Sequence, residues 1–415
     1  MTSRKTINLH SKTYNIPIRP TVVVCIDGLD PSYLESGVTS DILPTMVSWL
    51  KNGFHTTGQC AMPSVTNTNN VSIITGMPSN VHGINGNYYL DKSTGEEVMV
   101  LDDSTMHGST ILEQLAEQGL RVAAITAKDK LRKIINHGLS PDQGAICFSA
   151  QYADSCTLAE HGITDVEAWL GLPTPAQYSA DLSLFVLDAG VKLLQEKRAD
   201  VFYLTLSDFV QHKHAPGSPA ADQFMSAIDA RLRELEKLGA LVAVTGDHGM
   251  SAKCREDRLP NVLFLEDHLS EKWPQAGARV LCPIADPFVK HHGALGGFVR
   301  IHLTGQWKLA DVEEMLSYVR KLPQVQEALP GEEAAKVYEL PPDREGELVV
   351  IANHDAVIGS SSAKHDLSEL GGMRLRSHGG LSEKEIPLLR SEAVRVGTEK
   401  QVWHHYDIFD LAMNF

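Results

Sequence analysis

The sequence predicts an α/β protein with a doubly wound, largely parallel sheet and a smaller inserted α+β cap. Three observations carry this prediction. Short apolar runs alternate with amphipathic stretches between residues 21 and 245, which is typical of βαβ units. Three of these runs lead into an aspartate, and strands of open α/β sheets present functional groups just beyond their carboxyl ends. After residue 250 the alternation gives way to a strand, helix, strand, strand pattern.

The elements of the first part follow from two kinds of pattern. Each expected strand is a continuous apolar run, because a strand covered by helices on both faces has no polar side. Each expected helix has apolar residues at helical spacing. We expect strands over residues 22–26, 122–126, 145–148, 201–206 and 241–245, and helices over residues 44–51, 111–117, 129–136, 181–197 and 222–237.

A second unit is expected because the chain of 415 residues exceeds the usual size of a single hydrophobic core. We expect strands over residues 297–303, around Val325 and over 347–352, and a helix over residues 311–321. This set predicts a small α+β unit inserted into the main domain. The α/β core, which would carry the metal site, would then comprise residues 1–260 and 371–415, and the cap would comprise residues 261–370.

Composition narrows the choice of partners. The sequence holds 37 Lys and Arg against 52 Asp and Glu, a formal net charge of -15, which disfavours nucleic acid and anionic membranes. A small anionic substrate would therefore need local positive charge from metal ions or lysines. Polar and charged groups occur throughout the first twenty residues, which lack the apolar core of a signal peptide, and the six cysteines form no Cys-x-x-Cys pair. We expect a cytoplasmic protein without a zinc ribbon or a disulfide framework, and a homodimer is compatible with this composition.

Aspartate follows three of the predicted strands, and histidine closely follows two of these aspartates. Carboxylate oxygen and imidazole nitrogen together suit Zn²⁺, with Mn²⁺ and Fe²⁺ as rivals. One ion needs three or four ligands, so the set is large enough for two ions about 4 Å apart. A turn or helix-capping role is the competing interpretation for each aspartate alone. The candidates are Asp27, Asp208, His212, Asp247, His248 and His378, with His214 as the alternative to His212.

The segment from Met62 to Gly76 is rich in hydroxyl and amide groups and then turns apolar. The apolar run from Val71 predicts a helix whose N-cap lies among residues 66–69. A hydroxyl there would face backbone N–H groups that attract a phosphate, and a coordinating metal would hold it partly as alkoxide. Thr66 and Thr68 are therefore both candidate nucleophiles, and simple capping is the competing interpretation.

Together these segments resemble the alkaline phosphatase superfamily, in particular its nucleotide pyrophosphatase/phosphodiesterase-like branch. Its members carry a nucleophilic threonine in a Pro-[Thr/Ser]-x-Thr segment, which the chain matches at residues 63–66. The resemblance thus implies Thr66 rather than Thr68. The family segment Asp-x-x-x-His-x-x-Gly-Pro is matched from Asp208 to Pro216, with Ala215 in place of glycine.

The resemblance also implies roles for the remaining candidates. The segment His82-Gly-Ile-Asn-Gly-Asn87 matches a family motif whose asparagine helps to hold a phosphoryl oxygen, so Asn87 receives that role. Two Zn²⁺ ions per subunit are implied. One would be bound by Asp208, His212 and His378, and the other by Asp27, Thr66, Asp247 and His248.

A narrower resemblance is to the zinc enzymes of this branch that hydrolyse the carbon–phosphorus bond of phosphonoacetate to acetate and phosphate through a phosphothreonine. It rests on Thr66-Asn-Thr-Asn-Asn, where the diesterases have Thr-Phe-Pro-Asn-His, and on Lys128 and Lys130. Two lysines that share a face of an extended segment suit a small phosphonate substrate that also carries a carboxylate. An ordinary charged start to the helix over residues 129–136 is the competing interpretation.

Two other functions stay open at the level of sequence. A phosphodiesterase or nucleotide pyrophosphatase would need an aromatic slot for a base, for which Tyr88, Tyr89 and Phe209 are available. A non-catalytic metal-binding sensor would keep the ligands without turnover.

Overall fold

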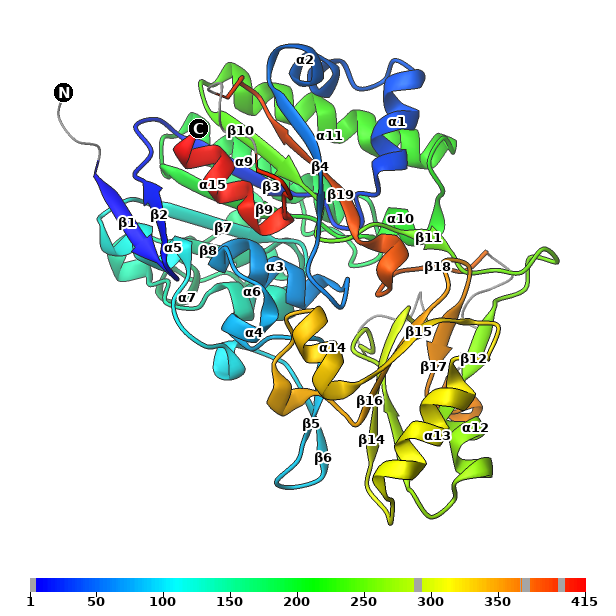
Figure 1. Cartoon of the computed structure of the whole chain (residues 1–415). Helices are drawn as coiled ribbons and strands as arrows, with labels where there is room; N and C mark the ends of the chain where they lie inside the picture. The colour runs from blue at the N-terminus through cyan, green and yellow to red at the C-terminus, as the bar shows by residue number, and fades with distance from the viewer. Residues whose placement is uncertain (1–4, 287–292, 366, 368–373, 395–399) are drawn as a thin grey trace.

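The structure is a computed structural model, and it describes residues 5–286, 293–365, 367, 374–394 and 400–415. Its centre is a seven-stranded sheet in the order β4-β19-β10-β3-β9-β7-β8 (Figure 1). The five strands from β10 to β8 are parallel, and β19 runs antiparallel to both of its neighbours. This confirms the predicted α/β class with a largely parallel sheet. The strands are β3 (Thr21–Cys25), β4 (Phe54–Gln59), β7 (Val122–Thr126), β8 (Ile146–Ser149), β9 (Val201–Thr205), β10 (Leu241–Thr245) and β19 (Glu385–Arg390).

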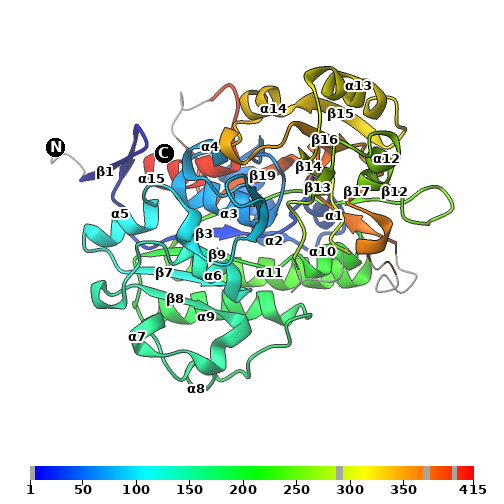
Figure 2. The ribbon, with the colours of Figure 1, turned by 90° about the horizontal axis from the view of Figure 1, so that it is seen from below.

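Helices cover both faces of this sheet. In β3, Val22 and Val24 pack into one hydrophobic core and Val23 and Cys25 into another, because successive side chains of a strand point to opposite faces. Figure 2 shows α9 and α11 along one face. The first core is completed by α1 (Pro31–Thr39), α2 (Pro44–Asn52), α9 (Asp181–Gln195) and α11 (Pro219–Lys237), and the second by α3 (Thr66–Thr75), α5 (Ile111–Glu117), α6 (Asp129–Ile135) and α15 (Ile408–Asn414).

The expected helix N-cap among residues 66–69 is wrong. Helix α3 begins at Thr66 after Val65, and its polar first turns are almost wholly buried. The side chains of Asn69 and Asn70 hydrogen-bond Ala61 and Asp247 instead of capping the helix. Polar residues that resemble a cap in the sequence are thus helical residues whose partners lie elsewhere in the fold.

A second group of elements lies beside the core in Figure 1 and has its own hydrophobic cluster. It contains a four-stranded antiparallel sheet in the order β13-β14-β16-β15, of which the sequence did not indicate β13. The predicted boundary between the α/β core and the cap at residues 260/261 stays a prediction, and the one at residues 370/371 lies outside the described residues. The group comprises β12 (Val262–Phe264), α12 (Leu265–Lys272), β13 (Ala278–Leu281), β14 (Phe298–Leu303), α13 (Leu309–Val319), β15 (Val325–Pro330), α14 (Gly331–Val337), β16 (Leu348–Ala352) and β17 (Val357–Gly359).

Shorter elements connect these layers. None of the helices in the described ranges is long and apolar enough to cross a lipid bilayer. The short elements are the hairpins β1 (Thr6–Leu9) with β2 (Lys12–Asn15) and β5 (Tyr88–Asp91) with β6 (Glu96–Met99), the pair β11 (Ser251–Ala252) with β18 (Arg376–Ser377), and α4 (Ser79–His82), α7 (Leu158–His161), α8 (Val166–Leu170) and α10 (Phe209–Lys213).

Candidate active site and metal centre

Three aspartates meet at one edge of the sheet because β10, β3 and β9 are parallel neighbours. Asp27 follows β3, Asp208 follows β9 and Asp247 follows β10. Gly28 adopts φ 71°, a left-handed conformation that glycine tolerates best, and its N–H donates to Asp247 Oδ1 at 3.1 Å. The turn after β3 is thereby joined to the turn after β10.

The carboxylates and histidines form two buried groups. Asp208, His212 and His378 make one, and Asp27, Asp208 and His248 make the other, with one ligand atom per residue within 4.8 Å of the others in each group. Asp208 Oδ2 lies 2.8 Å from His212 Nε2 and 3.7 Å from His378 Nε2. Asp208 therefore belongs to both groups, whereas the resemblance placed it at one ion.

Asp247 lies at the edge of the second group. Its Oδ2 is 3.7 Å from His248 Nε2 and accepts a hydrogen bond from Asn70 at 3.1 Å. Its Oδ1 accepts from the backbone N–H groups of Gly28 and His248. These bonds fix the orientation of the carboxylate.

All three histidines are oriented in the same way. Nδ1 of His212, His248 and His378 lies 2.7 to 2.9 Å from the backbone carbonyls of Arg376, Gly249 and Ser64 respectively. Since a carbonyl only accepts, each Nδ1 must donate, so that in the neutral ring it is Nε2, directed at the carboxylates, that carries the lone pair for a metal ion. This is the tautomer of a typical metal-binding histidine.

The site concentrates negative charge away from water. Burial, with Asp208 and Asp247 nearby, raises the pKa of Asp27 to about 7. Burial would also raise the pKa of Asp208, but Lys128 and His212 hold it well below its usual range. Burial lowers the pKa of His378 to about 3. Clustered buried carboxylates need compensating cations, so the chemistry of this group suits metal ions.

Thr66 is placed beside the second group, at the first position of α3. Its Oγ1 lies 3.3 Å from His248 Nε2, and it is the only partly exposed residue of that helix. Thr68 is fully buried and its hydroxyl has no hydrogen-bond partner among the described residues. The structure thus separates the two candidate threonines by access.

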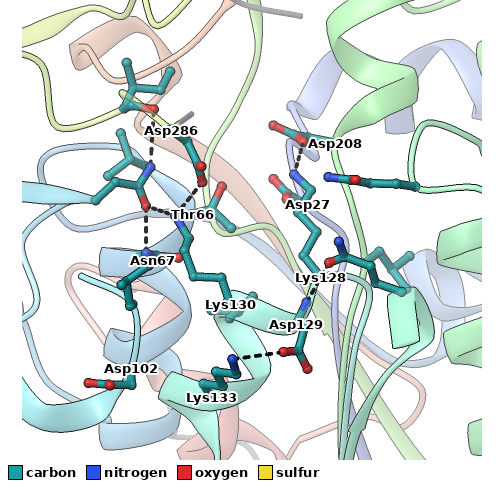
Figure 3. Close-up of a pocket in the computed structure, with 18 of the residues that line it drawn as sticks. Asp27, Thr66, Asn67, Asp102, Lys128, Asp129, Lys130, Lys133, Asp208 and Asp286 are labelled. Atoms are coloured by element: carbon teal, nitrogen blue, oxygen red, sulfur yellow. Dashed lines mark hydrogen bonds and ion pairs between the residues drawn. The ribbon is translucent and has the colours of Figure 1, made fainter. Parts of the chain in front are cut away.

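Lys128 and Lys130 reach the same cavity from α6 (Figure 3). The expectation that they share a face of an extended segment is wrong, because Lys128 is the N-cap of α6 and Lys130 lies in its first turn. Lys128 Nζ is 3.2 Å from Asp208 Oδ1. Lys130 Nζ donates to Asn87 Oδ1 at 2.8 Å and forms an ion pair with Asp286.

Burial changes the proton affinity of the two lysines differently. It would lower the pKa of Lys128, but Asp208 and Asp27 raise it above its usual value. The pKa of Lys130 is lowered by its burial, which outweighs the effect of Asp286.

Several residues at the site escaped the sequence analysis. Asn67 Nδ2 donates to Asn87 Oδ1 at 2.7 Å. In the sequence, Asn67 was visible only as one of several amide residues in the helix that begins at Thr66. Asp286 belongs to no motif, and Ser64 lies inside the Pro-[Thr/Ser]-x-Thr segment without a role of its own there. Ser64 accepts from His378 through its backbone carbonyl, which no side-chain pattern reveals.

The site opens into a cavity of about 360 Å³. Tyr88, Tyr89 and Phe209 are not among the described residues of its wall, whose aromatic member is Tyr152. The wall includes Asp27, Thr66, Asn67, Asn87, Leu101, Lys128, Lys130, Tyr152, Leu206, Asp208, Ile284, Asp286 and His378.

Comparison with known proteins gives a family match and a structural match. Residues 21–380 match the type I phosphodiesterase/nucleotide pyrophosphatase family. A crystal structure of phosphonoacetate hydrolase from Sinorhizobium meliloti 1021 in complex with phosphonoformate is 42% identical, covers 99% of both chains and gives a TM-score of 0.94. The chain belongs to the phosphonoacetate hydrolases of this family. The resemblance to enzymes that hydrolyse the carbon–phosphorus bond of phosphonoacetate is thereby confirmed.

Three further matches put this likeness in context. A structure of the same Sinorhizobium enzyme with phosphonoacetate is 41% identical over 99% of both chains, with a TM-score of 0.93. Murine ectonucleotide pyrophosphatase/phosphodiesterase 5 is 17% identical over 95% of this chain and 94% of its own, with a TM-score of 0.61, and so shares the fold. Phosphonoacetate hydrolase from Penicillium oxalicum is 68% identical over 28 residues, which is 7% of this chain and 39% of that protein.

Proposed function

We propose that this protein is a zinc-dependent hydrolase that cleaves phosphonoacetate to acetate and phosphate through a phosphothreonine. One observation carries the proposal: Lys128 and Lys130 line the same cavity as Thr66 and as members of both carboxylate–histidine groups, namely Asp27, Asp208 and His378. A molecule with a phosphonate and a carboxylate needs cationic partners for both ends. The Sinorhizobium relatives, in complex with phosphonoformate and phosphonoacetate, support this substrate class.

The residues present fit zinc. The Nε2 atoms face carboxylates, and neither oxygen of the buried Asp27 carboxylate has a hydrogen-bond partner among the described residues. A buried carboxylate without hydrogen-bond partners can bind a metal ion. Zinc ions bound here would act as Lewis acids that polarise the phosphonate and lower the pKa of the Thr66 hydroxyl and of water. The proposed ligands are Asp208, His212 and His378 for one ion and Asp27, Thr66, Asp247 and His248 for the other.

The chain's own residues then define the reaction. Thr66 Oγ1 attacks phosphorus, while Asn87 and the N–H groups at the start of α3 hold the phosphoryl oxygens. The carbon–phosphorus bond breaks and its electron pair passes to the methylene carbon. The adjoining carboxylate delocalises this charge, and Lys128 or Lys130 pairs with it. The carbon takes up one proton to give acetate, which balances the proton that the Thr66 hydroxyl loses when its oxygen bonds to phosphorus. Water finally cleaves the phosphothreonine, which releases phosphate and restores Thr66.

Turnover of phosphonoacetate tests the substrate. We expect the zinc-loaded protein to release acetate and phosphate in equal amounts, measured by ¹H and ³¹P NMR, and to hydrolyse p-nitrophenyl phenylphosphonate more slowly. Faster hydrolysis of the aryl ester would favour a phosphodiesterase. Tight zinc binding without phosphate release from either compound would favour a metal-binding sensor.

The lysines provide a second prediction. Lys130→Ala is expected to raise KM for phosphonoacetate about 10- to 100-fold, because a hydrogen bond to a charged group contributes about 1.5–3 kcal/mol. Initial rates against substrate concentration measure this. Lys133→Ala is the matched control for charge, since Lys133 lies on the same helix and lines the same cavity, but its ammonium pairs with Asp129 at 3.5 Å. An equal rise in KM for both variants would show that only the general charge of α6 matters.

A further inference from the structure

A buried ion pair lies next to the segments that carry two of the proposed zinc ligands. Lys253 Nζ is 2.9 Å from Glu383 Oε1, and neither side chain has any exposed surface. Neither residue lines the cavity. A buried ion pair gains little stability once the loss of hydration is counted, so stability alone does not account for its presence.

Glu383 contacts the segments that follow two of the proposed zinc ligands. Its backbone carbonyl accepts from the N–H of Gly249, the residue after His248, at 2.7 Å. Its Oε2 accepts from the N–H of Gly380, two residues after His378, at 3.1 Å. One residue thus holds both histidine-bearing turns.

These turns have little freedom to move. A Cβ at Gly249 would lie 2.8 Å from a carboxylate oxygen of Asp30 and 3.3 Å from Glu383 Cα. The rings of His248 and His378 stack with centroids 3.6 Å apart and an interplanar angle of 10°. A displacement of either turn would therefore move both rings.

The other contacts of the pair extend this connection. Ser251 Oγ and Ser382 Oγ donate to Glu383 Oε1 at 2.5 and 2.8 Å. Ser251 also pairs with Ser377, next to His378, between β11 and β18, which Figure 1 places at the junction of the core and the second group of elements. Lys253 Nζ donates to the carbonyl of His354 in that second group at 2.9 Å.

We propose that Glu383, charge-paired with Lys253, is a positioning residue that fixes His248 and His378 for zinc binding. The inference rests on the proposed zinc site and deepens it. Glu383 does not touch substrate. It acts through the two turns, and its carboxylate is required because one side chain must accept from Lys253, two serine hydroxyls and the N–H of Gly380.

Glu383→Gln tests the proposal. An amide has one accepting oxygen, so when this oxygen faces Lys253 and the serines its NH₂ group opposes the N–H of Gly380. We expect zinc binding, measured by competition with a chromophoric chelator, to weaken about 10- to 100-fold, as when a hydrogen-bond partner of a metal ligand is lost. Excess zinc should restore phosphonoacetate turnover without a change in KM.

Two further variants keep the test decisive. Glu345→Gln changes another buried ion pair, with Arg300. Among the described residues, the side chain of Glu345 accepts hydrogen bonds from Arg300 and Asn85 and from none of the segments next to the proposed zinc ligands, so this variant should bind zinc as the wild type does. Ser251→Ala removes one hydrogen bond to Glu383 without leaving a buried charge unpaired. It should weaken zinc binding by a smaller factor, and it carries the test if Glu383→Gln does not fold.

The outcomes separate this inference from the proposed function. Thermal unfolding of the zinc-free proteins measures how much stability Glu383→Gln and Glu345→Gln each lose. If the two losses are similar, weaker zinc binding by Glu383→Gln alone shows that Glu383 positions the ligands. A wild type that binds no zinc would contradict the proposed function itself. A wild type that binds zinc, with Glu383→Gln and Ser251→Ala binding equally tightly, would overturn the positioning role alone.

Discussion

Thr66→Ala is expected to lower kcat/KM for phosphonoacetate by about 10⁴-fold or more, as removal of a nucleophile commonly does. The hydroxyl lies at the start of α3 beside His248. Among the described residues of the cavity wall, one other side chain carries a hydroxyl, that of Tyr152, and it is exposed. Zinc content should change little, because the proposed aspartate and histidine ligands remain. Phosphate release gives the rate, and mass spectrometry of acid-quenched wild-type protein should detect a phosphate on Thr66.

Thr68→Ala is the matched control for this prediction. Thr68 belongs to the same helix and is two residues away, but it is fully buried and absent from the cavity wall. Its activity should stay within a few-fold of the wild type. If Thr68→Ala lost turnover and Thr66→Ala kept it, the nucleophile would be misassigned.

Asp208→Ala should have the second large effect. Asp208 is a proposed ligand of one ion and also lies within 4.8 Å of the ligand atoms of Asp27 and His248, so its loss removes a ligand from the first ion and a neighbouring negative charge from the second. We expect fewer than two zinc ions per chain after gel filtration, measured by atomic emission. The fall in kcat/KM should exceed the roughly 100-fold effect of losing a hydrogen-bond partner of a metal ligand.

His214→Ala serves as the control for ligand loss. His214 was the alternative to His212, but it is only partly buried and belongs to neither group. Its zinc content and rate should match the wild type. Two zinc ions retained by Asp208→Ala, or lost by His214→Ala, would show that the ligand set differs from the one proposed.

Elements with strong local signals could be predicted well. Strand β7 and helix α5 were predicted with the bounds that the structure gives, and β3, β9 and β10 to within a residue at each end. A continuous apolar run predicts a strand without information from distant residues, since its side chains must be buried on both faces. Strand β19 was missed because it depends on antiparallel pairing with two distant strands, β10 and β4, the latter more than three hundred residues earlier in the chain.

The sequence by itself determined that acidic groups would gather at the ends of parallel strands, because β3, β9 and β10 each end before an aspartate and parallel strands end at one edge. Only the tertiary structure decided how those groups are used. It placed Asp208 in both groups, Asp286 against Lys130, and Glu383 behind His248 and His378. The physical reason is distance along the chain: local patterns reveal burial and helical spacing, whereas the carbonyl that orients His378 belongs to Ser64, 314 residues away.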